Sequence, residues 1–147
     1  MDIREDLLEC WIQLTALIWS NRILKELTYH EATILRELKK RKGKPVNATK
    51  LSKKSGMKKP QMHRILRSME DRGMIRREIN PKDRRSQDIW VNPVADEFYE
   101  KDHARVLELL DVVVKEAGEE LVLQFIDSAT RMAKVYDEVQ EKTSQED

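Results

Sequence analysis

The sequence is poor in the residues on which many protein classes depend. Its 147 residues hold one cysteine, four glycines and four prolines, and aromatic residues make up 5%. The single cysteine, Cys10, excludes an internal disulfide, and no apolar run approaches the roughly 18 to 20 residues of a membrane span. The N-terminus is too acidic for a signal peptide. We therefore expect a cytoplasmic protein that makes no membrane contact.

Groupings of catalytic and metal-binding residues are also missing. The glycines are scattered, so they form no phosphate-binding loop, and no Ser/His/Asp grouping is apparent. Glu100 and His103 have the spacing of two metal ligands on one helical face, but no second such pair exists among the three histidines. A solvated helix face is the simpler interpretation of that pair. We expect neither an enzyme nor a bound cofactor or metal.

Charge is abundant and unevenly distributed. Residues 39–85 carry 18 basic and four acidic side chains, a net charge of +14. The other 100 residues carry 10 basic and 23 acidic side chains, a net charge of −13. Ordinary solvated helix charges are the plain alternative, but separation on this scale favours a polyanionic partner for the basic centre.

Apolar periodicity and capping signals divide the chain into helices and one pair of strands. Thr28 and Glu31 have the spacing of a capping box, Asn47 and Asn92 are N-cap candidates, and Gly73 is a stop signal. The predicted helices span about 3–25, 28 to the basic run at 39–44, 47–54, 59–72, 93–117 and 119–142, and the predicted strands span 74–79 and 87–91. The apolar stripe of the first helix covers more than half its circumference, which predicts contact with a partner subunit.

The order of helix, short helix, turn, longer helix and basic hairpin is that of a winged helix-turn-helix, whose second helix enters the major groove of DNA. The inward positions of the longer helix are Met62, Ile65, Leu66 and Met69. Its predicted DNA-facing positions are Lys58, Lys59, Gln61, His63, Arg64 and Arg67. Gln61 and Arg64 can bind adenine and guanine edges, whereas Lys59 or Arg67 can neutralise phosphates.

Several stretches resemble the MarR family of bacterial and archaeal transcriptional regulators. They are Leu27-Thr28, Leu51-Ser52, the run at 69–75 and the run at 83–86. The resemblance covers almost the whole chain. It implies a mainly helical α+β fold in a single domain, 1–147. Within it, a winged lobe at 28–92 joins dimerisation helices at 1–27 and 93–142, with a frayed tail at 143–147.

The resemblance also implies a function and site residues. Members of the family act as homodimers on pseudo-palindromic double-stranded DNA, usually repress, and lose DNA affinity when a small phenolic, lipophilic or oxidant signal binds. The Asp-x-Arg of the family's wing corresponds to Asp83 and Arg85: the carboxylate shapes the loop, and the arginine enters the minor groove. Lys82 and Arg84 are then candidates for phosphate contacts. Alternatively, Asp83 and Arg85 merely pair across a turn.

Two residues depart from the family pattern at the start of the predicted recognition helix. Lys58 occupies the position where a capping Ser or Thr is usual, and Pro60 lies in the first turn. A missing cap costs about 1 kcal/mol, which the fixed φ of proline offsets in part. These changes leave the fold assignment intact.

Sensing residues are predicted by the same resemblance. Family effectors bind between the dimerisation helices and the winged lobe, where the candidates are Trp11, Thr15, Trp19, Tyr29 and His30. A small aromatic or lipophilic effector would suit them. The simpler interpretation of the tryptophans is that they fill the core and the dimer interface. Cys10, followed by an aromatic, resembles the cysteine of the family's organic-peroxide sensors, but other tyrosines of those sensors are missing, and an inert cysteine is the alternative.

We therefore predict a MarR-like regulator, most simply a repressor. A ligand- or protein-binding dimer with only a minor DNA role is the alternative, because a fold alone does not fix function. Single-stranded nucleic acid is disfavoured, since the basic centre lacks aromatic residues for base stacking and Trp90 is expected to face the core.

Overall fold

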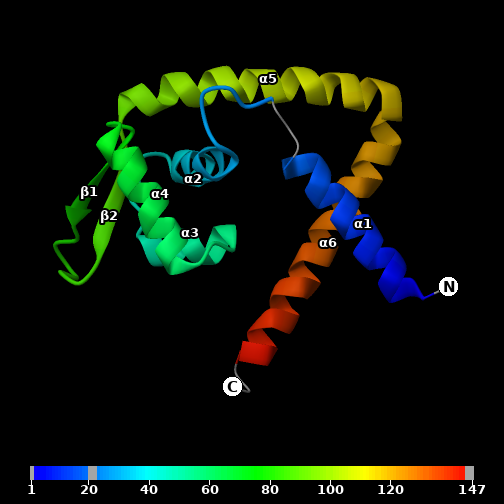
Figure 1. Cartoon of the computed structure of the whole chain (residues 1–147), viewed down its shortest axis with the longest axis horizontal. Helices are drawn as coiled ribbons and strands as arrows, with labels where there is room; N and C mark the ends of the chain where they lie inside the picture. Colours follow the sequence, from blue (N-terminus) through cyan, green and yellow to red (C-terminus); the bar gives the residue numbers. More distant parts are fainter. Residues whose placement is uncertain (1, 20–22, 145–147) are drawn as a thin grey trace. The chain divides into compact units, whose positions relative to one another are not determined.

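The computed structural model of the chain describes residues 2–19 and 23–144. Across these residues the fold is mainly helical, with six helices and one antiparallel pair of strands, as predicted. The elements in chain order are α1 (Ile3–Trp19), α2 (Tyr29–Lys40), α3 (Ala48–Ser55), α4 (Lys59–Asp71), β1 (Ile75–Ile79), β2 (Gln87–Val91), α5 (Pro93–Ala117) and α6 (Glu119–Ser144) (Figure 1). The chain divides into two compact units, Met1–Val106 and Leu107–Asp147.

The first unit contains a hydrophobic core to which α2, α3, α4 and the β1–β2 hairpin contribute. Leu35 of α2 and Ile89 of β2 are at most 1% exposed, and Leu51 of α3 is 2% exposed. Burying a side chain of this size stabilises a fold by about 1.5–3 kcal/mol. The predicted inward face of α4 lies in this core, with Met62, Leu66 and Met69 buried and Ile65 partly buried against them. We call the elements that share this core the winged lobe.

The predicted capping residues begin the helices of the winged lobe. Thr28 Oγ1 accepts a hydrogen bond from the Glu31 backbone N–H at 3.2 Å, and Glu31 Oε2 accepts one from the Thr28 N–H at 3.1 Å. Asn47 Oδ1 accepts from the Lys50 N–H at 2.9 Å at the start of α3. Gly73, with φ of 74°, adopts the left-handed conformation that lets the chain turn from α4 into β1. The capping box is confirmed.

The hairpin runs from a base beside the end of α4 to a tip at residues 80–86. Its register pairs Ile75 with Val91 at the base and Ile79 with Gln87 next to the tip. Val46 adds a one-residue antiparallel bridge to Ile89, whose N–H donates to the Val46 carbonyl at 2.9 Å. The chain between α2 and α3 is thereby fixed beside β2.

Two residues at the hairpin base differ from prediction. Met74 does not begin the first strand, because its N–H donates to the Met69 carbonyl at 2.9 Å and closes the end of α4. Asn92 directly precedes α5, but its side chain serves the hairpin instead. Its Nδ2 donates to the Gly73 carbonyl at 2.9 Å, and its Oδ1 accepts from Arg76 at 3.4 Å.

The prediction that the first helix reaches Lys25 is wrong. α1 ends at Trp19, and residues 23–28 form turns and bends. Backbone N–H groups in this segment do not continue a helix, because they bond to a side chain of α5. The N–H of Lys25 donates to Asp102 Oδ1 at 2.9 Å and that of Leu27 to Asp102 Oδ2 at 2.8 Å.

The predicted tail is also shorter than expected. Thr143 and Ser144 belong to α6, and their hydroxyls donate to the carbonyls of Val139 and Gln140, each at 2.9 Å. Such bonds to the preceding turn are compatible with a continuing helix. Residues 145–147 of the predicted tail lie outside the described residues.

Many apolar side chains of the helices outside the winged lobe are exposed. No side chain of α6 is buried, and Phe125 and Ile126 on this helix are 53% and 54% exposed. Exposed large apolar residues also recur on α1 and on the second half of α5, for example Leu7, Trp11 and Val113. Within the described parts of the chain, no helix combines the length and apolar character needed to cross a membrane.

Candidate nucleic-acid interface

The exposed face of α4 carries most of the predicted DNA-facing residues. Its exposed members are Lys58, Lys59, His63, Arg64 and Arg67. The Lys58 side chain makes no capping hydrogen bond, and Pro60 lies in the first turn. Among the described residues, the four cationic side chains of this face, Lys58, Lys59, Arg64 and Arg67, make no hydrogen bond or ion pair. Their charges are therefore available to an external anion.

Gln61 was expected to be exposed, but it is half-buried. Its amide Nε2 lies 3.4 Å from Nε2 of His30 in the first turn of α2. The ring of His30 also meets that of Tyr29 edge to face, with centroids 5.7 Å apart. A neighbouring helix therefore positions the amide that was predicted to bind a base.

The wing loop is shaped by two polar side chains. Asn80 Oδ1 accepts hydrogen bonds from the backbone N–H groups of Lys82 at 2.8 Å and Asp83 at 3.1 Å. Asp83 Oδ1 accepts one from the backbone N–H of Arg85 at 3.1 Å. This loop-shaping by the aspartate is the kind predicted. The contribution of Asn80 was missed, although asparagine at the start of a turn is a recognised signal for such bonds.

The basic side chains of the wing extend away from these bonds. Lys82, Arg84 and Arg85 are exposed, and within the described ranges none has a side-chain hydrogen bond or ion pair. In particular, Asp83 contacts the backbone of Arg85 and not its guanidinium group. The tip of the hairpin therefore presents three positive side chains that pair with no carboxylate, beside the single acid Asp83.

Other cations of the basic centre have structural partners. Arg77 donates to both carboxylate oxygens of Glu70, at 3.0 and 3.2 Å, and this hydrogen bonding lowers the pKa of Glu70 below its ordinary value. Arg72, at the end of α4, pairs with the buried Glu31 of the capping box. Only part of the +14 charge is therefore free to attract a polyanion, and the free part includes α4 and the wing tip.

Three lysines of α3 were not singled out by sequence reasoning. Lys50, Lys53 and Lys54 are exposed, and no ion pair engages their side chains among the residues described. Their charge was visible in the sequence, but their short helix offered no pattern that distinguished phosphate contacts from solvated charge. They extend the basic surface next to α4, because α3 and α4 pack together.

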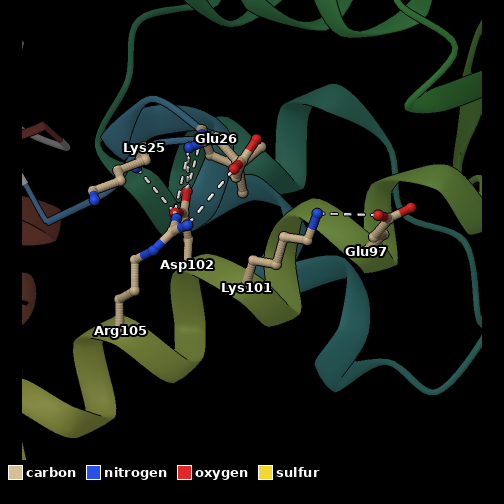
Figure 2. A network of polar contacts seen from close by, with 7 residues as sticks. Lys25, Glu26, Glu97, Lys101, Asp102 and Arg105 are labelled. Atoms are coloured by element: carbon tan, nitrogen blue, oxygen red, sulfur yellow. Dashed lines mark hydrogen bonds and ion pairs between the residues drawn. The ribbon is translucent and has the colours of Figure 1, made fainter.

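A buried carboxylate fixes the segment that leads into the winged lobe. Asp102 of α5 is 1% exposed and accepts hydrogen bonds from the backbone N–H groups of Lys25, Glu26 and Leu27 and from Arg105 Nη1 at 2.6 Å (Figure 2). Burial is the largest single influence and raises its pKa. The hydrogen bonds together outweigh burial, so the pKa of Asp102 lies below its ordinary value.

The predicted effector residues lie on α1 and at the start of α2. Trp11 and Tyr29 are 46% and 44% exposed, and Thr15 and His30 are half-buried. The side chain of Trp19 lies outside the described residues. Tyr29 and His30 are in contact, and the role of the five positions as an effector pocket stays a prediction.

The remaining candidate residues have other surroundings. Cys10 is exposed on α1. Glu100 pairs with Lys39 at 3.3 Å, His103 stacks on Tyr99 with centroids 5.4 Å apart, and no cluster of three or more metal-ligating side chains occurs in the described chain. Trp90 is only half-buried, with Arg76 lying 5.3 Å from its ring centroid. It is therefore not fully in the core as expected.

Comparison with known proteins finds similarity to the winged lobe and to the fold as a whole. Residues 25–86 match a family model described as MarR family. No curated protein sequence matches the chain. Three solved structures illustrate the likeness of fold. A MarR family transcriptional regulator from Rhodococcus sp. RHA1 has 17% identity and a TM-score of 0.73, with 87% of this chain and 92% of that chain covered.

The other two were solved with bound molecules. The transcriptional repressor CouR, bound to a 23-mer DNA duplex, has 18% identity and a TM-score of 0.74, with 84% of this chain and 89% of that chain covered. PcaV from Streptomyces coelicolor, in complex with its natural ligand, has 17% identity and a TM-score of 0.69, with 91% and 96% covered. At such identities the likeness establishes the fold.

Proposed function

We propose that this chain, whose residues 25–86 match the MarR family model, represses transcription as a homodimer on pseudo-palindromic double-stranded DNA. The family consists of transcriptional regulators and not of enzymes. The observation that carries the proposal is the group of unpaired cations on α4 and at the wing tip. DNA-bound CouR, which shares the fold, supports the same partner.

The two parts of this surface have different tasks. Arg64 of α4 reads a guanine edge in the major groove, and Gln61, held by His30, reads an adenine edge. Lys58, Lys59, His63 and Arg67 contact the backbone around them. Arg85 enters the minor groove, while Lys82 and Arg84 bind phosphates beside it and Asp83 maintains the loop.

The second copy of the chain is held through the exposed apolar faces of α1, α5 and α6. Leu7, Trp11, Val113, Phe125 and Ile126 are large apolar residues that a monomer leaves more than a third exposed. Exposed apolar surface marks interaction sites in other proteins. Two lobes related by a two-fold axis then contact half-sites about one helical turn apart.

Regulation by a signal is the third part of the proposal. A small aromatic or lipophilic molecule binds near Trp11, Thr15, Trp19, Tyr29 and His30 and lowers DNA affinity. The contact between His30 and Gln61 supports this arrangement, because it links a predicted effector residue to a predicted base-reading residue. An oxidant acting on Cys10 is the other candidate signal, since this thiol is exposed. A peroxide response that persists in Cys10→Ser would exclude the thiol.

Footprinting the purified protein on the DNA that flanks its own gene tests the proposal. We expect protection of two half-sites on one face of the duplex, and weaker protection when an effector is added. Binding to random duplex DNA with no salt dependence would instead favour a ligand- or protein-binding dimer. Fragments of equal length and random sequence are the matched control.

A further inference from the structure

A pocket of about 330 Å³ opens at the base of the hairpin, where α2 ends, β2 ends and α5 begins. Figure 1 shows this junction at the end of the hairpin that meets α5. The residues that matter here are Lys39, Lys44, Arg76, Trp90, Pro93 and Asp96. Its volume lies at the lower end of the range for small-molecule sites, about 300–1,000 Å³. All of its lining residues belong to the first compact unit.

The pocket lies at the opposite end of the hairpin from the wing tip. Arg76 pairs with Trp90 next to the base, whereas Ile79 pairs with Gln87 next to the tip. The antiparallel bridge between Val46 and Ile89 directs Lys44 toward the base, because chain preceding Val46 runs alongside the chain following Ile89. The Arg76–Trp90 pair and the Ile79–Gln87 pair are three residues apart along the strand, which is about 10 Å. These cations therefore lie away from the wing tip that the proposed DNA surface includes.

The charges around the pocket are not all compensated. Lys39 Nζ lies 2.6 Å from Asp96 and 3.3 Å from Glu100, so this cation is fully engaged and the three side chains together carry one negative charge. Lys44 is exposed and, across the described residues, has no ion pair. Arg76 pairs with Glu78 at 3.0 Å, but both side chains are about half exposed, and such pairs are weak. Arg76 Nη1 also donates to Asn92 Oδ1 at 3.4 Å. Lys44 and the remaining N–H groups of the Arg76 guanidinium are thus available to an incoming anion.

The rest of the lining is apolar. Trp90, Val91 and Pro93 form its wall, and Arg76 lies over the indole ring. The Trp90 indole nitrogen is buried and has no hydrogen-bond partner among the described residues, so the ring is held by packing alone on this side. Two cations beside an apolar wall are complementary to a ligand that combines a negative group with an apolar body.

We propose that this pocket binds a small organic anion, with its carboxylate or phosphate between Lys44 and Arg76 and its apolar part against Trp90 and Pro93. Asp96 limits the affinity, because it is the negative charge in the lining and its partner Lys39 cannot turn to the ligand. The site is separate from the predicted effector residues on α1 and α2. It does not depend on the proposed DNA function, because none of its lining residues belongs to the proposed DNA surface.

Nuclear magnetic resonance titration of the full chain tests this site directly. Benzoate and phenyl phosphate are the two probes, and the Trp90 indole signal, assigned with Trp90→Phe, reports binding. We expect at least one probe to shift this signal saturably. The probe that binds more tightly shows whether the site prefers a carboxylate or a phosphate. Benzyl alcohol, the neutral counterpart of benzoate, should bind at least about tenfold more weakly. The site is excluded if neither probe saturates by roughly 10 mM or if benzyl alcohol binds equally well.

Variants locate the binding. Lys44→Gln and Arg76→Gln should each weaken the stronger probe by about tenfold, and Arg84→Gln at the wing tip should leave it unchanged. Asp96→Asn should strengthen binding severalfold, a gain that misfolding cannot produce. Unchanged affinity in all three pocket variants would overturn the assignment. Duplex DNA that shifts wing signals but not Trp90 tests the proposed function separately, so either proposal can fail alone.

Discussion

The winged lobe and α6 use apolar residues in opposite ways. The lobe buries Leu35, Met62, Leu66 and Ile89 to 1% exposure or less, whereas α6 has no buried residue and leaves Phe125 half exposed. Hydrophobic burial is the main favourable contribution to folding. The lobe therefore contains its own source of stability, and α6 needs a surface supplied from elsewhere.

The two regions also differ in their charges. In the lobe, some cations are fixed in pairs, such as Arg77 with Glu70, while those of α4 and the wing tip are unpaired. In α6 the ion pair between Arg131 and Asp127, at 3.1 Å, is highly exposed and contributes little. The difference agrees with the two proposed tasks, binding a polyanion and binding a second copy of the chain.

Salt should weaken the lobe's interaction with DNA most strongly. If a dimer contacts 6 to 10 phosphates, affinity falls by about three to five orders of magnitude between roughly 50 and 200 mM salt. Fluorescence anisotropy with a labelled operator measures the slope. Arg84→Gln should reduce the slope by about 2 per dimer, because one phosphate contact is lost in each subunit. A slope that does not change in this variant removes Arg84 from the interface.

A charge placed on the apolar face of α6 should break the dimer. Phe125→Glu removes about 1.5–3 kcal/mol of burial in each subunit, so dimer affinity falls by about two to four orders of magnitude. Sedimentation velocity measures the change. Lys134→Glu is the control, because position 134 lies on the opposite side of the helix from Phe125. A dimer of unchanged affinity in Phe125→Glu would mean that this face is not the interface.

Removing the buried carboxylate should destabilise the lobe. Asp102→Ala leaves three backbone donors without their partner and Arg105 with only its longer pair to Glu26, and it should lower the free energy of unfolding by about 3 kcal/mol. Chemical denaturation measures this loss. Lys101→Ala, which breaks an exposed pair with Glu97, should change stability by less than about 0.5 kcal/mol.

The same residue predicts a pH dependence. The pKa of Asp102 is lower in the folded chain than its ordinary value, so its stabilisation is present above pH 4 or so and is lost as pH falls through the folded pKa. Asp102→Asn should therefore show a smaller loss of stability on acidification than the unaltered protein. Equal acid sensitivity of the two proteins would show that other carboxyl groups dominate.

An unpaired and a paired arginine should respond differently to truncation. Arg85→Ala should weaken operator binding by about 1–3 kcal/mol with little change in stability. Arg77→Ala should do the reverse, because Arg77 bonds to Glu70 within the lobe. Thermal unfolding and anisotropy measured on both variants give the comparison. Equal loss of operator binding in both would contradict the division into paired and unpaired cations.

The smallest expected effect is at the start of α4. Lys58 occupies the N-cap position without a capping bond, so Lys58→Asn should stabilise the lobe by about 1 kcal/mol. The same change removes a cation and should weaken DNA binding slightly. A denaturation midpoint that does not rise would indicate that the fixed φ of Pro60 already provides the stabilisation that a capping bond would add.

The fold was predictable wherever local signals agreed with packing. Thr28, Asn47 and Gly73 mark helix boundaries by capping and backbone preferences that act within a few residues, and the structure has them at those boundaries. The first helix was predicted too long because its apolar pattern continues past Trp19. The backbone N–H groups at 25–27 bond instead to Asp102, which is 75 residues away from Leu27 in the sequence. No local pattern could reveal that contact.

The candidate site shows the same limit. The unpaired charges of Arg64 and Arg85 follow from a basic helix and a basic turn, both visible in the sequence. The pairing of Arg72 with Glu31 and of Gln61 with His30 depends on how α2 crosses α4. Composition counted Arg72 and Arg85 alike, and only the tertiary contacts distinguish a structural cation from an available one.

The Asp102 contact has a consequence for how the chain tolerates mutation. The Asp102 side chain accepts hydrogen bonds from three consecutive backbone N–H groups (Figure 2). Every residue except proline has such an N–H group. Positions 25 and 26, whose side chains are exposed, should accept most substitutions but not proline. Position 102 should accept almost none. A library covering these sites would thus show one intolerant position in α5 that controls a permissive segment far from it in the sequence.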